Sequence, residues 1–173
     1  MRAPYFSALA TVVFWLTLSA NPALSAVPQP QQAVAPTDVY KVAIDRTVSL
    51  AEAADSMRLR ANALNLKLVA ELALSKQVEA MTDQAQRTIT IFQFCDAVTA
   101  KDLIDLNLDF SVYMPCRIAL IEDASGQGWL VMMDVNVDSV AKEKRLSQAL
   151  KDRINVVRQS LVEIMQAGAK GEL

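Results

Sequence analysis

Alternating apolar and polar positions predict five β-strands in this chain. In residues 39–45, Tyr40, Val42 and Ile44 occupy one face and charged residues occupy the other. A period of two is typical of a strand with one buried face. Residues 88–95 carry β-branched and aromatic side chains on both faces, which indicates a central strand. Similar patterns place the remaining strands at residues 66–74, 117–122 and 129–135.

Helical spacing of apolar residues predicts three helices between and after these strands. Ser49 and Glu52 have the spacing of a capping box, in which each side chain bonds the other residue's backbone N–H, so the first helix begins there. A shorter amphipathic helix is predicted at residues 98–108. Apolar residues at intervals of three and four predict one long helix at residues 139–167, which Gly168 would end.

The order of the predicted elements is β-α-β-β-α-β-β-α. The mostly polar residues 75–87 are interpreted as a loop or a short exposed helix. Pro115 suits the first residue of a strand because it has no N–H to donate to a ladder, and the glycines within residues 123–128 indicate a hairpin loop. A sheet with a hairpin and separate helices predicts an α+β fold. We expect a two-layer sandwich with its helices packed on one face of a five-stranded sheet.

The N-terminal region has the pattern of an export signal. Arg2 precedes an uncharged apolar segment, and small residues follow at the positions that a signal peptidase reads, so cleavage is expected after Ser25 or Ala26. The apolar run is short for a membrane span, and an uncleaved anchor is the alternative. The predicted organisation is a signal peptide at residues 1–26, a flexible linker at 27–37, and a single α+β domain with a long C-terminal helix at 38–173. We therefore expect a periplasmic or secreted protein with no membrane contact after cleavage.

Composition narrows the classes of function. The 173 residues include 17 Lys and Arg, 19 Asp and Glu, and no His, which gives a net charge of -2. Without a basic excess, a nucleic-acid binder is not expected. Without His, catalytic Ser-His and Cys-His pairs, imidazole zinc sites and His-ligated haem are excluded. No phosphate-binding loop or nucleophile elbow is present. Whether the chain is an enzyme stays open, a non-catalytic role is favoured, and no cofactor is predicted.

Cys95 and Cys116 are the only cysteines, and three interpretations of them stay open. An exported domain meets an oxidising compartment, where the two could form a disulfide if their strands are antiparallel neighbours. They could instead be two buried thiols that act as small apolar groups. In the third interpretation, Met114, Met132 and Met133 lie near the cysteines, and the sulfur atoms form a redox site or bind Cu(I).

Charged residues flank the predicted hairpin. Glu122 and Asp123 precede its loop, where carboxylates are usually solvated or bond their own backbone; acid–base chemistry or a hard cation is the alternative. Arg117 stands at the start of the preceding strand. It is expected to form a salt bridge or to bind an anion.

Two segments of the chain resemble a known family. Residues 92–97, with the sequence FQFCDA, form a predicted strand that runs into a helix. Residues 114–123 read MPCRIALIED, and a turn with glycines and the sequence WLV follow them. Both segments are similar to motifs of the domain of unknown function 302 (DUF302) family. The residues that match these motifs are Phe94, Asp96, Pro115, Arg117, Glu122 and Asp123.

The resemblance covers roughly Val39 to Val135. It implies the two-layer fold and a homodimer, and it supplies no catalytic residue. Other branches of the family have Gly-Asn-Pro where this chain has Cys95 and Asp96, so a role tied to that turn is not implied. We expect an exported, dimeric, non-catalytic module that binds an unknown protein or a small ligand. The alternative is a thiol redox or Cu(I)-binding protein.

Overall fold

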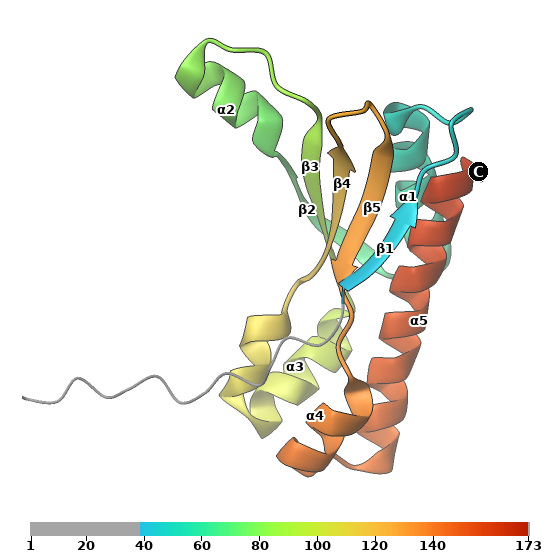
Figure 1. Ribbon diagram of the computed structural model, residues 1–173. Helices are drawn as coiled ribbons and strands as arrows, with labels where there is room; N and C mark the ends of the chain where they lie inside the picture. Colours follow the sequence, from blue (N-terminus) through green and yellow to red (C-terminus); the bar gives the residue numbers. More distant parts are fainter. Residues whose placement is uncertain (1–38, 173) are drawn as a thin grey trace, which may run out of the picture. The chain divides into compact units, whose positions relative to one another are not determined.

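The computed structural model describes residues 39–172, and they form one five-stranded antiparallel sheet with helices (Figure 1). The order of strands in the sheet is β1-β5-β4-β3-β2. Every neighbouring pair is antiparallel, so the sheet contains no crossover between parallel strands. The strands are β1 (Val39–Ala43), β2 (Lys67–Ala73), β3 (Ile89–Cys95), β4 (Cys116–Glu122) and β5 (Gly128–Met133). All five predicted strands are confirmed, and β3 is an interior strand.

Helical elements make up most of the remaining described chain. The first is α1, and its predicted capping box is present: the Ser49 hydroxyl accepts from the Glu52 N–H, and the Glu52 carboxylate accepts from the Ser49 N–H. The polar segment 75–87 contains an exposed helix, one of the two forms expected of it. The elements are α1 (Leu50–Ala63), α2 (Leu74–Thr82), α3 (Ala97–Leu106), the 3-10 helix η1 (Leu108–Tyr113), α4 (Val137–Lys144) and α5 (Gln148–Lys170).

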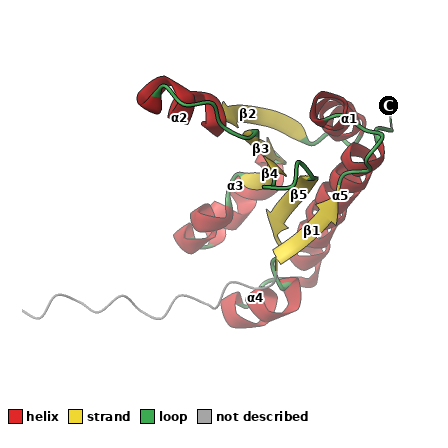
Figure 2. Ribbon diagram, turned by 45° about the horizontal axis from the view of Figure 1, so that its top comes forward, coloured by secondary structure: helices red, strands yellow, loops and turns green. Residues whose placement is uncertain are grey.

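Helices α1 and α5 pack side by side and cover one face of the sheet (Figure 2). The main core lies between them and the strands, and Phe92, Phe94, Ile118, Leu120 and Leu130 are its fully buried sheet residues. This layer confirms the two-layer α+β sandwich. We call the sheet face opposite α1 and α5 the second face.

The other helices depart from the predicted arrangement on one face. In Figure 1, α3, η1 and α4 lie beyond the lower end of the strands, and α2 extends from the upper end. A second, smaller core joins the lower elements, with Leu103, Phe110 and Val140 buried at its centre. The sheet and α1 with α5 thus form the sandwich, and α3, η1 and α4 extend it at one end.

The predicted long C-terminal helix is two helices. Arg145 has a left-handed backbone, with φ of 55°, and ends α4. Ser147 then caps α5 by accepting a hydrogen bond from the Leu150 N–H. The predicted end at Gly168 is also wrong, because α5 continues to Lys170 and Gly171 adopts the left-handed cap conformation, with φ of 67°.

Within residues 39–172, no helix has the length and apolar character needed to cross a membrane. The predicted signal peptide and linker lie outside the described residues.

Candidate ligand-binding cavity

An apolar cavity of about 530 Å³ lies at the end of the sheet where α3, η1 and α4 are attached. Its wall combines β3, β4 and β5, as far as Ile91, Ala119 and Val131 within the strands, with side chains from α3, η1, α4 and α5. Buried members of the wall include Leu103, Phe110, Met132 and Val140. A cavity of this size, with apolar walls and few polar groups, is typical of sites for small ligands.

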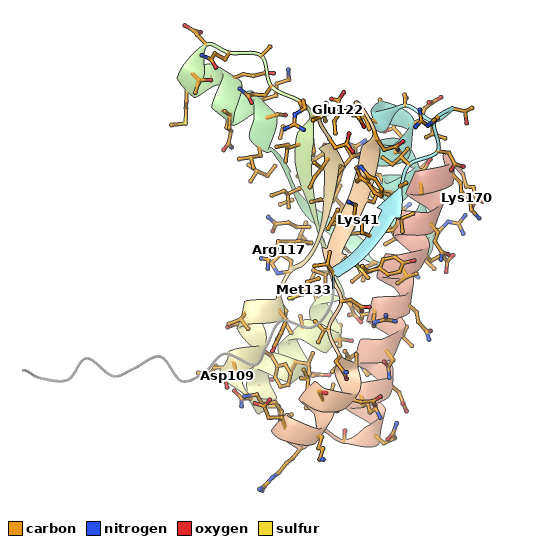
Figure 3. The ribbon with its side chains drawn as sticks, in the orientation of Figure 1. Lys41, Asp109, Arg117, Glu122, Met133 and Lys170 are labelled. Carbon is orange, nitrogen blue, oxygen red and sulfur yellow. The ribbon has the colours of Figure 1, made fainter. Side chains whose placement is uncertain are left out.

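Three lining residues mark where the cavity opens to solvent. Val39 is 67% exposed and Met133 is 40% exposed, and the Arg117 side chain is exposed as well. Figure 3 shows Arg117 and Met133 close together at the lower end of the strands. We call Val39, Arg117 and Met133 the mouth of the cavity.

Asp96 fixes the start of α3 at one side of the cavity. Its carboxylate accepts hydrogen bonds from the N–H groups of Val98 and Thr99 and from the Thr99 hydroxyl, the last at 2.6 Å. These bonds lower the pKa of Asp96 below its ordinary value, and the bond from the Thr99 hydroxyl has the largest effect. The charge of the nearby Arg153 lowers this pKa further. Arg153 also donates to the Thr99 hydroxyl and forms an ion pair with Asp102. Asp96 is therefore an ionised helix cap whose carboxylate oxygens already accept hydrogen bonds from the first turn of α3.

A second ion pair holds α5 against the end of β5. Arg158 of α5 donates from Nε and Nη2 to the two carboxylate oxygens of Asp134, at 2.5 and 2.7 Å. This pairing raises the pKa of Arg158, with the hydrogen bond to Asp134 as the main cause. Arg158 lines the cavity, but its charge is matched by Asp134.

The strand register shows why Cys95 and Cys116 are not bonded. Strands β3 and β4 are antiparallel neighbours, as a disulfide would need, but Cys116 lies opposite Phe94. Successive residues of a strand point to opposite faces, so Cys116 packs toward the main core with Phe94 and Cys95 belongs to the second face. Both are free thiols. The disulfide interpretation is therefore wrong.

The structure brings the five predicted sulfur residues to one cavity but gives no support to a thiolate site. Cys95, Cys116, Met114, Met132 and Met133 all line the wall. Burial raises the pKa of Cys116 to about 11. The pKa of Cys95 is also raised, mainly by burial and to a smaller extent by the negative charge of Asp96. Both shifts favour the neutral thiol over the thiolate that reacts with disulfides and binds soft metals. Among residues 39–172, no group of three His, Cys, Asp or Glu side chains is arranged to hold a metal ion.

The predicted acidic pair is outside the cavity wall: Figure 3 shows Glu122 at the upper end of the strands, and Asp123 follows it in the chain. Asp123 accepts hydrogen bonds from the Ser125 N–H and hydroxyl, the Gln127 N–H and the Trp129 indole N–H. These bonds hold the pKa of Asp123 well below its ordinary range, and the bond from the Ser125 hydroxyl has the largest effect. The Glu122 carboxylate accepts from the Thr88 N–H. Asp123 therefore orders the hairpin, as expected of an acidic residue in a tight turn, and Glu122 joins the end of β4 to Thr88 before β3.

The remaining motif residues divide between packing and the cavity. Phe94 is fully buried in the main core. Pro115 lines the cavity directly before β4, so its missing N–H removes no bond from the ladder. Arg117 lines the mouth.

Sequence reasoning did not find three polar residues at the cavity. Thr99 and Arg158 line its wall, and Arg153 donates a hydrogen bond to Thr99. Asp96 and Thr99 have the spacing of a helix cap and its third residue, a signal that was available in the sequence. The partners of Arg153 and Arg158 lie 51 and 24 residues away. No local pattern could identify these pairs.

A family assignment follows from the comparison with known families. The family described as "Domain of unknown function DUF302" matches residues 40–168, a span that includes the sheet and most of α5. This chain belongs to the DUF302 family. The resemblance seen in the two motifs is thereby confirmed, and both motifs lie within the matched span.

A solved DUF302 structure shares the fold. It is described as the crystal structure of an uncharacterized conserved DUF302 protein from Bacillus stearothermophilus. The similarity has a TM-score of 0.60 at 12% sequence identity, and covers 75% of this chain and 96% of that one. At this identity the likeness concerns the fold alone. No curated protein matches this DUF302 chain.

Proposed function

We propose that this DUF302 protein is a non-catalytic binding module that holds a small, largely apolar ligand in the cavity at the end of its sheet. The observation that carries the proposal is the cavity itself: about 530 Å³ of space within a mostly apolar wall. Burial of apolar ligand surface in such a space supplies binding free energy without any reacting group.

The charged groups of the wall support binding rather than catalysis. Asp96 and Arg158 are held in hydrogen-bonded pairs, and the thiol pKa values of Cys95 and Cys116 are raised. A general base or a nucleophile must instead be free of such bonds and have a pKa that lets it accept a proton or attack near neutral pH. These side chains position the wall.

The test is a fluorescence titration with N-phenyl-1-naphthylamine, a neutral apolar probe that brightens on leaving water. We expect saturable binding to the wild type. Two variants fill the cavity from different elements: Ala119→Leu on β4 and Ala100→Leu on α3, both at half-buried lining positions. Each is expected to weaken binding at least about tenfold, because the added side chain occupies space that the probe needs.

The matched control is Ala80→Leu, at an exposed position of α2 outside the cavity wall. It adds the same carbons and should leave the titration unchanged. Circular dichroism melts show whether each variant is folded. If folded Ala119→Leu and Ala100→Leu both bind the probe as the wild type does, or if the wild type does not bind it, the cavity is not the binding site.

The proposed module is exported and acts as a homodimer. Export is motivated by the signal pattern at residues 1–26. Dimerisation is motivated by the family resemblance and by Leu106, Leu108 and Val112 of α3 and η1, apolar residues outside the cavity wall that are each more than half exposed. Exposed apolar patches often mark interfaces. N-terminal sequencing of the mature protein tests export, and an intact N-terminus would contradict it. Sedimentation velocity at tens of micromolar, on the scale of typical weak dimers, tests dimerisation, and a monomer at this concentration would contradict it.

A further inference from the structure

We propose that the ligand is a single-chain amphiphile with an anionic carboxylate head, and that Arg117 at the mouth binds this head while the chain enters the cavity. The proposal rests on the proposed function and names the chemical class of the ligand. It follows from the distribution of charge around the apolar wall.

Three charged residues line the cavity, and the charged groups of two of them already have hydrogen-bonding partners. Asp96 is bonded to Thr99 and the start of α3, and Arg158 is paired with Asp134. Arg117 has no carboxylate within 4.0 Å among the residues from 39 to 172. Among the three charged residues of the wall, Arg117 is therefore the one whose charged group has neither an ion pair nor a side-chain hydrogen bond in the described structure, and its charge is positive.

The second face extends this positive field. Lys41 pairs across the sheet with Val131, and Lys67 pairs with Cys95, so both lysines share the face of Arg117. The carboxylates of the strands lie on the other face: Glu71 is opposite Phe92 and bonds Arg58 of α1, and Glu122 follows the register of Ile118 and Leu120. A cation would meet only repulsion from the strand charges here, whereas an anion is attracted.

The acidic residues of the lower helices do not cancel this field. Asp102 is paired with Arg153, Asp105 with Lys101, and Asp109 with Lys144. Each of these charges has a partner within its own part of the structure, which leaves Arg117 as the cation that a ligand's head can meet.

Arg117 is placed to receive a head group without leaving water. It is the second residue of β4, on the same face as Ala119, whose side chain lines the cavity. Its exposed guanidinium presents several N–H donors in a fork that matches the two oxygens of a carboxylate. The exposed position means that binding desolvates the ion pair only in part, so the pair adds selectivity and a modest gain in affinity.

The test displaces N-phenyl-1-naphthylamine with three ligands that share a dodecyl chain: dodecanoate, dodecanol and dodecyltrimethylammonium, each below its micelle concentration. For the wild type we expect dodecanoate to bind about five- to tenfold more tightly than dodecanol, as one charge-assisted hydrogen-bonded pair allows. Dodecyltrimethylammonium should bind more weakly than dodecanol.

Arg117→Gln should abolish the preference for dodecanoate over dodecanol. The matched control is Lys170→Gln, which removes one positive charge at the far end of α5, away from the mouth (Figure 3). It should retain the preference of the wild type. The Arg117 side chain is exposed and makes no hydrogen bond within the described part of the chain, and the pairing of its backbone with β3 does not depend on the side chain, so Arg117→Gln is expected to fold normally.

The outcomes separate the two proposals. If the probe binds and all three ligands displace it equally, or if Arg117→Gln keeps the preference for dodecanoate, the assignment of an anionic head to Arg117 is wrong while the cavity remains a binding site. If the wild type binds neither the probe nor any dodecyl ligand, the proposed function itself is wrong.

Discussion

The contact between α1 and α5 at Gly168 determines how closely the helix layer approaches the sheet. An ideal Cβ placed on Gly168 would lie 2.6 Å from Met57 Cγ, 3.0 Å from Leu130 Cδ1 and 3.1 Å from the Ala53 carbonyl oxygen. The first distance is far below van der Waals contact, and the Ala53 oxygen belongs to the backbone of α1. Gly168→Ala therefore cannot be accommodated without displacing α5 or Met57.

The expected cost follows from two opposing effects. Alanine is favoured over glycine inside a helix by about 0.8–1 kcal/mol, whereas overpacking a dense core costs about 1–3 kcal/mol. Because the short contacts at Gly168 involve two side chains and one backbone atom, we place the overpacking cost near the upper end. Gly168→Ala should lose about 1–2 kcal/mol of unfolding free energy, which lowers Tm by roughly 3–8 °C in a domain of this size.

Urea titration followed by circular dichroism measures this loss. The matched experiment is a double-mutant cycle with Met57→Ala, which removes the closest contacting atom. In that background Gly168→Ala should be neutral or stabilising, so the two substitutions should couple by about 1 kcal/mol or more. If Gly168→Ala stabilises the wild-type protein, helix propensity outweighs packing and the close approach of α5 to α1 is not what this account describes.

Other consequences concern the caps, the thiols and the hairpin. Ser49→Ala should cost about 1 kcal/mol in chemical denaturation by removing the hydroxyl that caps α1, and an unchanged midpoint would contradict the capping box. With iodoacetamide at about pH 8, Cys95 should react before Cys116, whose buried thiol has a pKa of about 11; equal rates in the native protein would contradict its burial. Because the folded-state pKa of Asp123 is lowered, its ionised form stabilises the fold above the unfolded-state pKa of about 3.9, and this contribution is lost as pH falls through the folded-state pKa. Asp123→Asn should therefore lower the urea midpoint at neutral pH, with the difference from wild type shrinking below about pH 4; a difference independent of pH would contradict the role of the charge.

Local patterns in the sequence were sufficient to predict the strands and the first helix. The alternation of Tyr40, Val42 and Ile44 gives β1 its buried face, and the spacing of Ser49 and Glu52 gives α1 its cap. Both signals depend on neighbours within a few residues. They can be read without knowledge of the tertiary structure.

The helix break was missed because the apolar periodicity continues across it. Val140 of α4 and Leu150 and Ile154 of α5 all pack in the second core, as does Leu146 between the two helices. Their spacing fits one continuous helix, although the chain turns at Arg145. The end of α5 was placed at Gly168 for a related reason. This glycine allows α5 to approach α1 closely, and the sequence alone does not distinguish such a glycine from one that caps a helix.

The sulfur residues show the limit of prediction within a sheet. That β3 and β4 are antiparallel neighbours agrees with the condition set for a disulfide. Whether Cys116 lies opposite Cys95 or opposite Phe94 depends on a register difference of one residue, and that difference puts the thiols on opposite faces. The cavity is a tertiary feature of the same kind, since its walls come from strands and helices that are distant in sequence.

Methyl NMR of the methionines tests the central claim, that the cavity is the binding site, most directly. Met114, Met132 and Met133 line the cavity, whereas Met57 is buried in the main core and Met81 is 86% exposed on α2. Titration of protein labelled with ¹³C at the methionine methyl groups with N-phenyl-1-naphthylamine should shift the three cavity signals through the ring currents of the probe and leave Met57 and Met81 unchanged. Shifts at Met81 with none at the cavity methionines would contradict the account.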